Sequence, residues 1–200
     1  KISDKSKEIV DVSGRIVMPG FIDAHTHAIF GGSRVGEFEQ KIKGVSYEEI
    51  MKSGGGIRNT VKKTRELTVP EMIEILRENT KRMSETGTTT VEVKSGYGLN
   101  FETEISMLKA INEFQSDSID VIPTYMGAHE FPEGISREDY VEEIITRHIP
   151  EVSSASLSRF CDIFCEDGVY TVEETERILN VAGDYGLKLK VHADELKESG

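Results

Sequence analysis

The chain has 200 residues, of which 37% are hydrophobic, and its 36 acidic and 24 basic side chains give a net charge of −12. This composition excludes an intrinsically disordered protein, and the negative charge argues against nucleic acid and anionic lipid as partners. No apolar run is long enough to span a bilayer, and the polar N-terminus lacks a secretory signal. We therefore expect a cytoplasmic globular protein, and an anionic substrate would need a locally placed cation.

The two cysteines, Cys161 and Cys165, lie in one strand-like apolar run. An extended strand holds them too far apart to form a disulfide, so we expect buried free thiols in a reducing compartment. A Cys-x3-Cys metal site is the alternative, but no second cysteine pair accompanies it.

The first chemical feature follows a short N-terminal section. Residues 1–17 are interpreted as the end of a β-rich section that leads into the main domain, residues 18–200. The apolar pair Phe21–Ile22 then predicts the end of a buried strand. His25 and His27 follow, and side chains at i and i+2 of a strand point to the same face, so both imidazoles can bind one zinc or iron ion. The alternative is a turn in which each histidine only bonds to backbone.

Two glycine-bearing loops and a capping box come next. Arg34 ends the first loop, shortly after the histidines, and the pattern at Ser46–Glu49 matches a capping box that begins a short helix. Residues 53–58 contain three consecutive glycines without the Lys-Ser/Thr ending of a phosphate-binding loop. We interpret this second loop as a flap over a pocket.

The remainder of the chain alternates between helix and strand signals. Helices are expected after the capping residues Thr68, Asn100, Ser136 and Thr171. The β-branched and apolar runs between them predict strands at residues 88–94, 119–125, 160–165 and 187–191. Together with the strand before the first histidine, this alternation is typical of parallel βα units.

Polar side chains gather where these strands end. The carboxyl ends of the strands share one face in a (β/α)8 barrel, and that face holds the active site. The residues concerned are His25, His27, Lys94, Tyr97, His129, Glu130, Glu166, Asp167, His192, Asp194 and Glu195. The competing doubly wound sheet would place a glycine fingerprint after its first strand, where this sequence has His-x-His. A barrel needs eight strands, so we expect an α/β chain that holds about the first five βα units of a longer (β/α)8 protein.

Several motifs resemble those of a known family. The stretch Pro19–His27 is similar to the opening signature of the amidohydrolase superfamily. A narrower resemblance, to the imidazolonepropionase family, covers nearly the whole chain from about Val10 onward. It rests on His27-Ala-Ile-Phe-Gly-Gly-Ser-Arg34, Ser53-Gly-Gly-Gly-Ile57, Glu92-Val-Lys-Ser-Gly-Tyr-Gly98, Gly127-Ala-His-Glu130 and Val191-His-Ala-Asp-Glu195.

This resemblance implies a metal-dependent hydrolase of histidine degradation, which opens the cyclic amide of 4-imidazolone-5-propanoate to give N-formimidoyl-L-glutamate. It implies that a single zinc or iron ion is held by His25, His27 and His192, with an aspartate beyond the present sequence as a further ligand. A catalytic histidine after the sixth strand would also lie beyond it. The resemblance suggests a homodimer when the protein is full length.

The resemblance also implies a set of residues around the small anionic substrate. The substrate-binding residues would be Arg34, Tyr47, Tyr97, His129 and Glu195. A guanidinium can bind the propanoate carboxylate through two parallel hydrogen bonds, which suits Arg34. His129 and Glu195 would in addition be catalytic, because each can move protons.

Three alternatives stay open. Some amidohydrolases bridge two metals with a carboxylated lysine, but Lys94 ends the second strand and the fourth ends in Glu166, so we expect one metal. Another amidohydrolase, such as a nucleobase-type deaminase, would share the metal motif and leave Arg34 without a carboxylate to bind. A metal-free binding or structural βα protein, in which the histidines only pack, is the most distant alternative.

Overall fold

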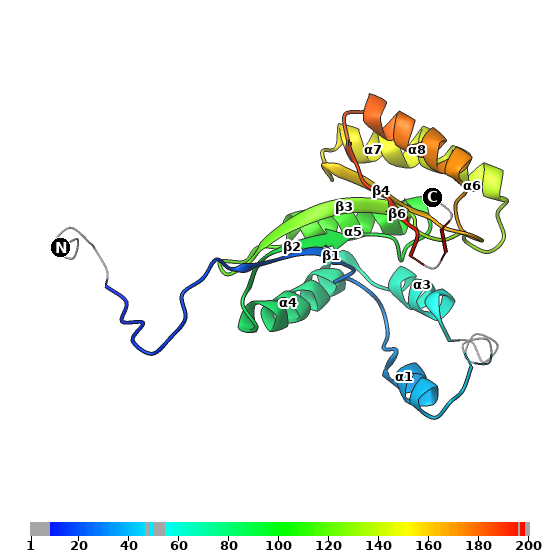
Figure 1. The fold of residues 1–200 in the computed structure, drawn as a ribbon. Coiled ribbons are helices and arrows are strands. Elements are labelled where there is room, and N and C mark those ends of the chain that lie inside the picture. The colour runs from blue at the N-terminus through cyan, green and yellow to red at the C-terminus, as the bar shows by residue number, and fades with distance from the viewer. Residues whose placement is uncertain (1–8, 47–48, 50–54, 196, 199–200) are drawn as a thin grey trace.

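The strands of the chain form one curved, parallel sheet (Figure 1). The computed structural model describes residues 9–46, 49, 55–195 and 197–198. Neighbouring strands follow chain order, and each pairs with the next in parallel: β1 (Phe21–Thr26), β2 (Thr88–Lys94), β3 (Asp120–Ala128), β4 (Phe160–Cys165) and β5 (Lys188–Leu189). The two-residue strand β6 (His192–Ala193) also pairs with β4, so β5 and β6 together form an interrupted fifth strand.

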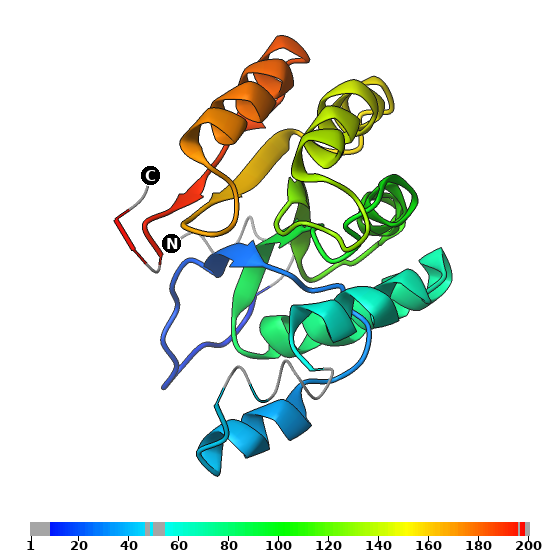
Figure 2. The same cartoon turned by 90° about the vertical axis from the view of Figure 1, so that its right-hand side faces the viewer.

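Helices cover the outer side of this sheet and lie in an arc around it (Figure 2). They are α1 (Val35–Ile42), α3 (Ile57–Arg65), α4 (Val69–Glu85), α5 (Phe101–Glu113), α6 (Arg137–Glu143), the π-helical turn η2 (Ile144–His148), α7 (Ile149–Ser154) and α8 (Val172–Asp184). Strands inside and helices outside make half of a (β/α) barrel, which confirms the predicted fold class. Among the described helices, none is long and apolar enough to cross a membrane.

Local hydrogen bonds begin the helices where the sequence predicts. The Asn100 side chain accepts from the Thr103 amide at 2.8 Å, and the Ser136 hydroxyl accepts from the Asp139 amide at 3.1 Å. The predicted box at Thr171 is complete, since the Glu174 amide donates to its hydroxyl at 3.2 Å and the Glu174 carboxylate accepts from its amide at 2.9 Å. These caps satisfy backbone amides that have no partner inside a helix.

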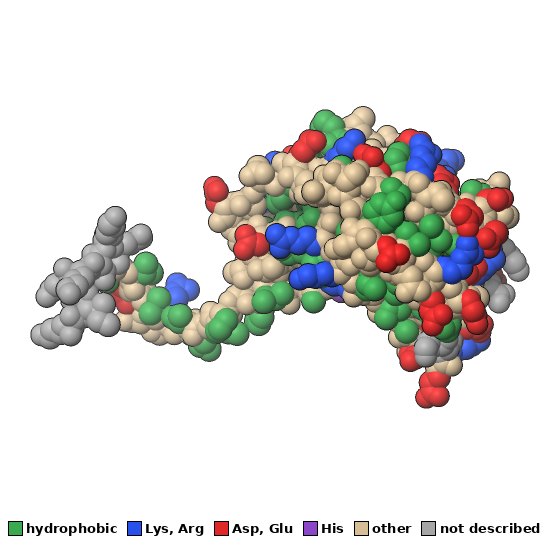
Figure 3. Space-filling view, turned by 90° about the horizontal axis from the view of Figure 1, so that it is seen from above, with side chains coloured by type: hydrophobic (Ala, Val, Ile, Leu, Met, Phe, Trp, Pro, Cys, Tyr) green, Lys and Arg blue, Asp and Glu red, His purple; other side chains and the backbone are tan. Residues whose placement is uncertain are grey.

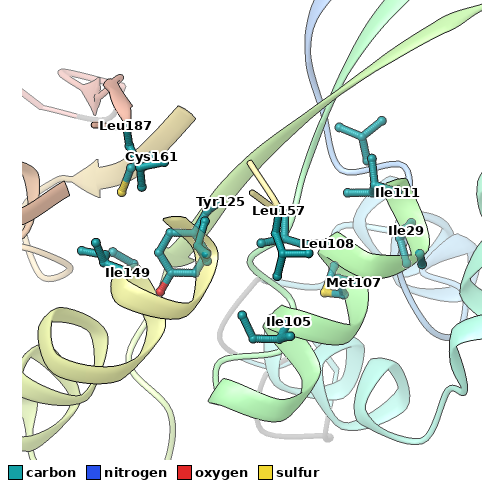
Figure 4. Packing of buried hydrophobic residues seen from close by; sticks show 14 of the residues in the cluster. Ile29, Ile105, Met107, Leu108, Ile111, Tyr125, Ile149, Leu157, Cys161 and Leu187 are labelled. Atoms are coloured by element: carbon teal, nitrogen blue, oxygen red, sulfur yellow. The ribbon is translucent and has the colours of Figure 1, made fainter. Parts of the chain in front are cut away.

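Alternation along the strands separates an apolar outer face from a polar inner face. Val91 and Val93 of β2 belong to the core between strands and helices, whereas Glu92 and Lys94 on the same strand face the barrel interior. Figure 4 shows Tyr125 of β3 pointing toward Ile149 of α7 within that core. The inner face therefore carries the polar side chains. Both cysteines are buried free thiols, as predicted.

The structure corrects the prediction for the first strand. Phe21 and Ile22 are not buried but 54% and 73% exposed, because β1 is an edge strand that pairs only with β2. Residues 9–12, part of the section interpreted as β-rich, have no regular structure. Figure 3 shows hydrophobic side chains along this N-terminal segment, which stands away from the body of the molecule.

The region between β1 and α4 is more helical than predicted. Helix α1 begins directly after Arg34, and α3 begins at Ile57, within the stretch interpreted as a glycine-rich flap. The capping-box hydrogen bonds of Ser46 and Glu49 are present, at 3.0 and 3.2 Å. Most of the short helix expected after them lies outside the described residues, as do the first two residues of the glycine-rich loop, Ser53 and Gly54.

Candidate metal and substrate site

Five aromatic side chains from four different strand ends form a continuous row. His25 lies in β1 and His27 directly follows it, Tyr97 follows β2, His129 follows β3, and His192 begins β6. Ring centroids are separated by 4.3 Å for His192 and His25, 5.8 Å for His25 and His27, 4.6 Å for His27 and His129, and 5.3 Å for His129 and Tyr97. The fold therefore brings these predicted site residues together at the carboxyl ends of the strands.

His25 and His192 approach each other through their ring nitrogens. Nε2 of His192 lies 2.9 Å from Nδ1 and 3.2 Å from Nε2 of His25, with the rings nearly perpendicular at 84°. Burial lowers the pKa of His25, and the nearby His192 lowers it further. A neutral imidazole presents a lone pair, which is the form that binds a metal ion.

His27 has one ring nitrogen that is buried from solvent. Its ring stacks on that of His129 with 9° between the planes, and its Nδ1 is buried without a hydrogen-bond partner. Burial, with His129 and His25 nearby, lowers the pKa of His27 to about 2. A neutral, unpartnered nitrogen beside two further imidazoles fits the donor set of a zinc or iron site.

The three histidines are adjacent without converging on one point. Within the described part of the chain, no group of three His, Cys, Asp or Glu side chains is close enough to enclose an ion. His25 and His192 form the close pair, and His27 is turned toward His129. The residues fit a metal chemically, and two of the three are already arranged as a pair.

His129 is oriented by the loop after β2. Its Nδ1 lies 2.9 Å from the Gly96 carbonyl oxygen. A carbonyl oxygen can only accept a hydrogen bond, so Nδ1 carries the proton. Burial lowers the pKa of His129, so the ring is neutral near neutral pH with Nε2 free to accept. Burial also raises the pKa of Tyr97, whose hydroxyl therefore stays protonated and can donate.

Arg34 and Tyr97 line one cavity with His27. This cavity has a volume of about 420 Å³, within the range of small-molecule sites, and its lining residues are His27, Phe30, Ser33, Arg34, Val35, Phe38, Thr60 and Tyr97. Arg34 Nε donates to Glu37 at 2.8 Å, and its side chain is 41% exposed. The arrangement places a cation, a hydroxyl and a candidate metal ligand around one small-molecule cavity.

The loop that carries Tyr97 is held by Glu104, a residue that the sequence reasoning missed. The buried Glu104 carboxylate accepts from the backbone amides of Gly96, Gly98 and Leu99 at 2.8, 2.7 and 2.9 Å. Arg65 donates to the carbonyl oxygens of Gly98 and Leu99 at 2.6 and 2.7 Å. A glutamate near the start of an otherwise apolar helix face was the available signal.

A second missed group is a buried network of charges on the inner face. Lys94 Nζ donates to Glu92 at 2.7 Å and to Asp162 at 2.6 Å, and Asp162 Oδ1 lies 3.0 Å from Nδ1 of His192. Lys190 Nζ also reaches Glu92, at 2.7 Å. An aspartate in the middle of the apolar run Phe160–Cys165 was the signal for this network, because charges in central strands need partners.

The two remaining predicted residues contribute less to this geometry. Glu195 is exposed and follows β6; its backbone amide donates to Glu166 Oε2 at 3.0 Å, and its carboxylate makes no hydrogen bond with the other described site residues. Tyr47 lies outside the described residues.

A sequence profile of the amidohydrolase family matches residues 8–65. Among solved structures of similar fold is the 5-methylcytosine deaminase from Klebsiella pneumoniae liganded with phosphonocytosine, with a TM-score of 0.64 and 17% identity over 95% of this chain and 43% of that chain. That likeness concerns the fold alone. The strand-end histidines, the half-barrel and this profile all point to the amidohydrolase superfamily as the class of protein.

The chain belongs to the imidazolonepropionase family of that superfamily, as its curated relatives show. The chain is 47% identical over 203 residues to the imidazolonepropionase of Clostridium tetani, covering 100% of this chain and 48% of the relative. It is 48% identical over 198 residues to that of Fusobacterium nucleatum, covering 96% of this chain and 47% of the relative. The match to that of Haloarcula marismortui is 43% over 198 residues. The chain thus spans about half the length of the curated relatives it matches.

Proposed function

We propose that the full-length protein hydrolyses the cyclic amide of 4-imidazolone-5-propanoate to N-formimidoyl-L-glutamate, a step of histidine degradation. The observation that carries the proposal is that His27, Arg34 and Tyr97 line the same cavity. It joins a candidate metal ligand to a cation suited to a carboxylate. Identities of 43–48% to imidazolonepropionases support the same substrate.

The proposed cofactor is one zinc or iron ion held by His25, His27 and His192. When bound, such an ion would supply a Lewis acid and would lower the pKa of water at the site, so that hydroxide becomes available near neutral pH. The chain's own contribution is to set the three imidazoles at neighbouring strand ends, where burial lowers the pKa of His25 and of His27. Lys94 is already paired with two carboxylates, which supports one metal rather than two bridged by a carboxylated lysine.

Arg34 and Tyr97 are proposed to bind the substrate's propanoate arm. The guanidinium can form two charge-assisted hydrogen bonds with the carboxylate, and the Tyr97 hydroxyl can donate a third. Glu37 already occupies Arg34 Nε, so the remaining guanidinium nitrogens would face the ligand. Tyr47 is proposed as a further contact near the same carboxylate.

His129 and Glu195 are proposed to contact the ring and to move protons. The free Nε2 of neutral His129 can accept a proton or a hydrogen bond from the ring, since Nδ1 is committed to Gly96. Glu195 lies three residues after His192, and its carboxyl group can protonate the departing ring nitrogen as the C–N bond breaks. Water supplies the oxygen that remains on the ring-opened product.

The proposal also covers the substrate class, the oligomeric state and the cellular compartment. The substrate is a small anion, and the full-length protein is proposed to be a cytoplasmic homodimer that binds neither nucleic acid nor membrane. The net charge of −12 and the two buried free thiols support this setting.

The test compares Arg34→Met in the full-length protein with the wild type on 4-imidazolone-5-propanoate. Loss of a charge-assisted hydrogen-bond pair should raise KM about 10- to 100-fold, with a smaller change in kcat. Arg58→Met is the matched control, because Arg58 pairs with Glu133 at 2.6 Å on the surface and does not line this cavity. An unchanged KM in Arg34→Met would contradict the substrate assignment and favour an amidohydrolase for an uncharged ring, such as a nucleobase-type deaminase.

A further inference from the structure

Asp162 of β4 is placed to control the orientation of His192. Its Oδ1 accepts from Nδ1 of His192 at 3.0 Å and from the Ile163 amide at 2.9 Å, while Oδ2 accepts from Lys94 at 2.6 Å. Both carboxylate oxygens are therefore occupied, and the side chain is 1% exposed. A carboxylate held in this way cannot rotate away from the imidazole.

Lys94 and Glu92 of β2 hold Asp162 in turn. The Lys94 side chain is 2% exposed and lies between the two carboxylates, and Glu92 receives further hydrogen bonds from Lys190 and from the Thr124 hydroxyl. The network thus joins β2, β3 and β4 to the segment that carries His192.

Such a network is a poor source of stability. Burying charges removes them from water, and an apolar replacement of equal volume is often as stable or more stable than a buried ion pair. A role in placing a functional group explains why charges occupy the inner face here. The free end of this network is His192, whose Nε2 points at His25.

We propose that Asp162, held by Lys94 and Glu92, is a positioning residue that keeps His192 in the Nδ1–H tautomer with Nε2 directed at the metal position. A carboxylate can only accept, so it selects the imidazole tautomer whose Nδ1 carries the proton. The inference rests on the proposed metal site. It gives the buried charges of Asp162, Lys94 and Glu92 a role in orienting His192.

The first test is the metal affinity of the full-length protein, measured by competition between the protein and a chromophoric chelator for Zn²⁺. Asp162→Asn keeps the shape and removes the charge, and it should raise the Zn²⁺ dissociation constant about 10- to 100-fold. Lys94→Met should weaken Zn²⁺ binding as well. In the double variant Asp162→Asn/Lys94→Met, the Zn²⁺ dissociation constant should rise by less than the product of the two single-variant increases, because both residues act through His192.

Tyr125→Phe is the matched control for loss of a buried hydrogen bond. Tyr125 is fully buried and bonds His148 at 2.8 Å on the outer face of β3, away from the network. This variant should lower the melting temperature and leave the Zn²⁺ dissociation constant within about twofold of the wild type. A similar result for Asp162→Asn, a lower melting temperature with Zn²⁺ affinity within twofold, would overturn the proposal.

The second test observes the His192 tautomer directly in the wild type and uses a variant only to assign the signal. Nitrogen-15 NMR of the metal-free wild type at neutral pH should show His192 as the Nδ1–H tautomer, with its signal assigned by its loss in His192→Asn. A His192 protonated at Nε2, or one exchanging between tautomers, would overturn the proposal. A wild type that takes up no Zn²⁺ while His192 is held as Nδ1–H would instead contradict the proposed metal site, so the two failures are distinguishable.

Discussion

Three side chains of the candidate site are each oriented by another group. Asp162 contacts His192, the Gly96 carbonyl contacts His129, and Glu37 contacts Arg34. Fixed partners of this kind reduce the reorganisation needed when a ligand or an ion binds. The arrangement is that of a site in which the supporting residues matter almost as much as the contacting ones.

His148 is a buried histidine outside the site, and it makes the protein sensitive to acid. Burial lowers its pKa to about 4, although Glu143 acts in the opposite direction, whereas a histidine in the unfolded chain titrates near 6.5. The unfolded chain therefore binds more protons below pH 6.5, so the stability that neutral His148 provides is complete above that pH and is lost as the pH falls toward 4.

We predict that the free energy of unfolding falls by about 2 kcal/mol between pH 7 and pH 5 through His148 alone. Urea unfolding of the full-length protein at both pH values, for the wild type and His148→Gln, measures this contribution. Tyr125→Phe is the control, because it removes the hydrogen bond but keeps the titrating imidazole. An equal pH dependence in His148→Gln and the wild type would refute the assignment.

At the scale of elements, the loop between β2 and α5 depends on one carboxylate. Glu104→Gln keeps an oxygen in place but removes the charge that three backbone amides share. The loop carries Tyr97, and its Gly96 carbonyl accepts a hydrogen bond from His129. We therefore predict that kcat/KM for 4-imidazolone-5-propanoate falls about tenfold or more in Glu104→Gln. This loss is consistent with the about 1.5–3 kcal/mol that a hydrogen bond to a charged group contributes.

Glu113→Gln, at the exposed end of the same helix, should leave kcat/KM unchanged. Full activity in Glu104→Gln would show that the loop keeps its shape without the clamp.

The elements that the sequence predicts best are those whose signals are local. A cap such as Asn100 involves residues three apart, and the alternation in Thr88–Lys94 is complete within one strand. The network of Lys94 with Asp162 joins residues 68 positions apart, so it is visible only once the strand order is known. Helix α3 was missed because Gly56 at its start provides no side-chain cap.

In the candidate site too, the sequence predicts residues that have a local signal and misses those that depend on long-range contacts. The resemblance and the strand-end pattern select His25, His27, His129, Tyr97 and His192, and the fold brings these residues together. The groups that orient them, Glu104 and Asp162, come from a helix and a strand interior, where neither motif spacing nor strand ends point. The exposure of Phe21 was mispredicted because apolar character alone does not distinguish an edge strand from a central one.

At the scale of the whole molecule, the half-barrel leaves apolar surface and a strand edge uncovered. Exposed side chains on and before β1 include Ile16, Val17, Met18, Phe21 and Ile22. Unpaired strand edges with apolar faces promote association between chains. We predict that the 200-residue chain alone elutes from size exclusion as oligomers or aggregates and lacks activity; a monodisperse, active monomer would contradict this.

The central claim is that strand-end histidines and a carboxylate-binding arginine make a metal-dependent hydrolase of imidazolone propanoate. The most direct measurement follows ring opening of 4-imidazolone-5-propanoate by the full-length protein while its metal content is determined. We predict about one zinc or iron per chain, activity that falls in proportion as a chelator removes it, and recovery when the metal is restored. A protein that holds stoichiometric metal yet leaves this substrate intact would contradict the account.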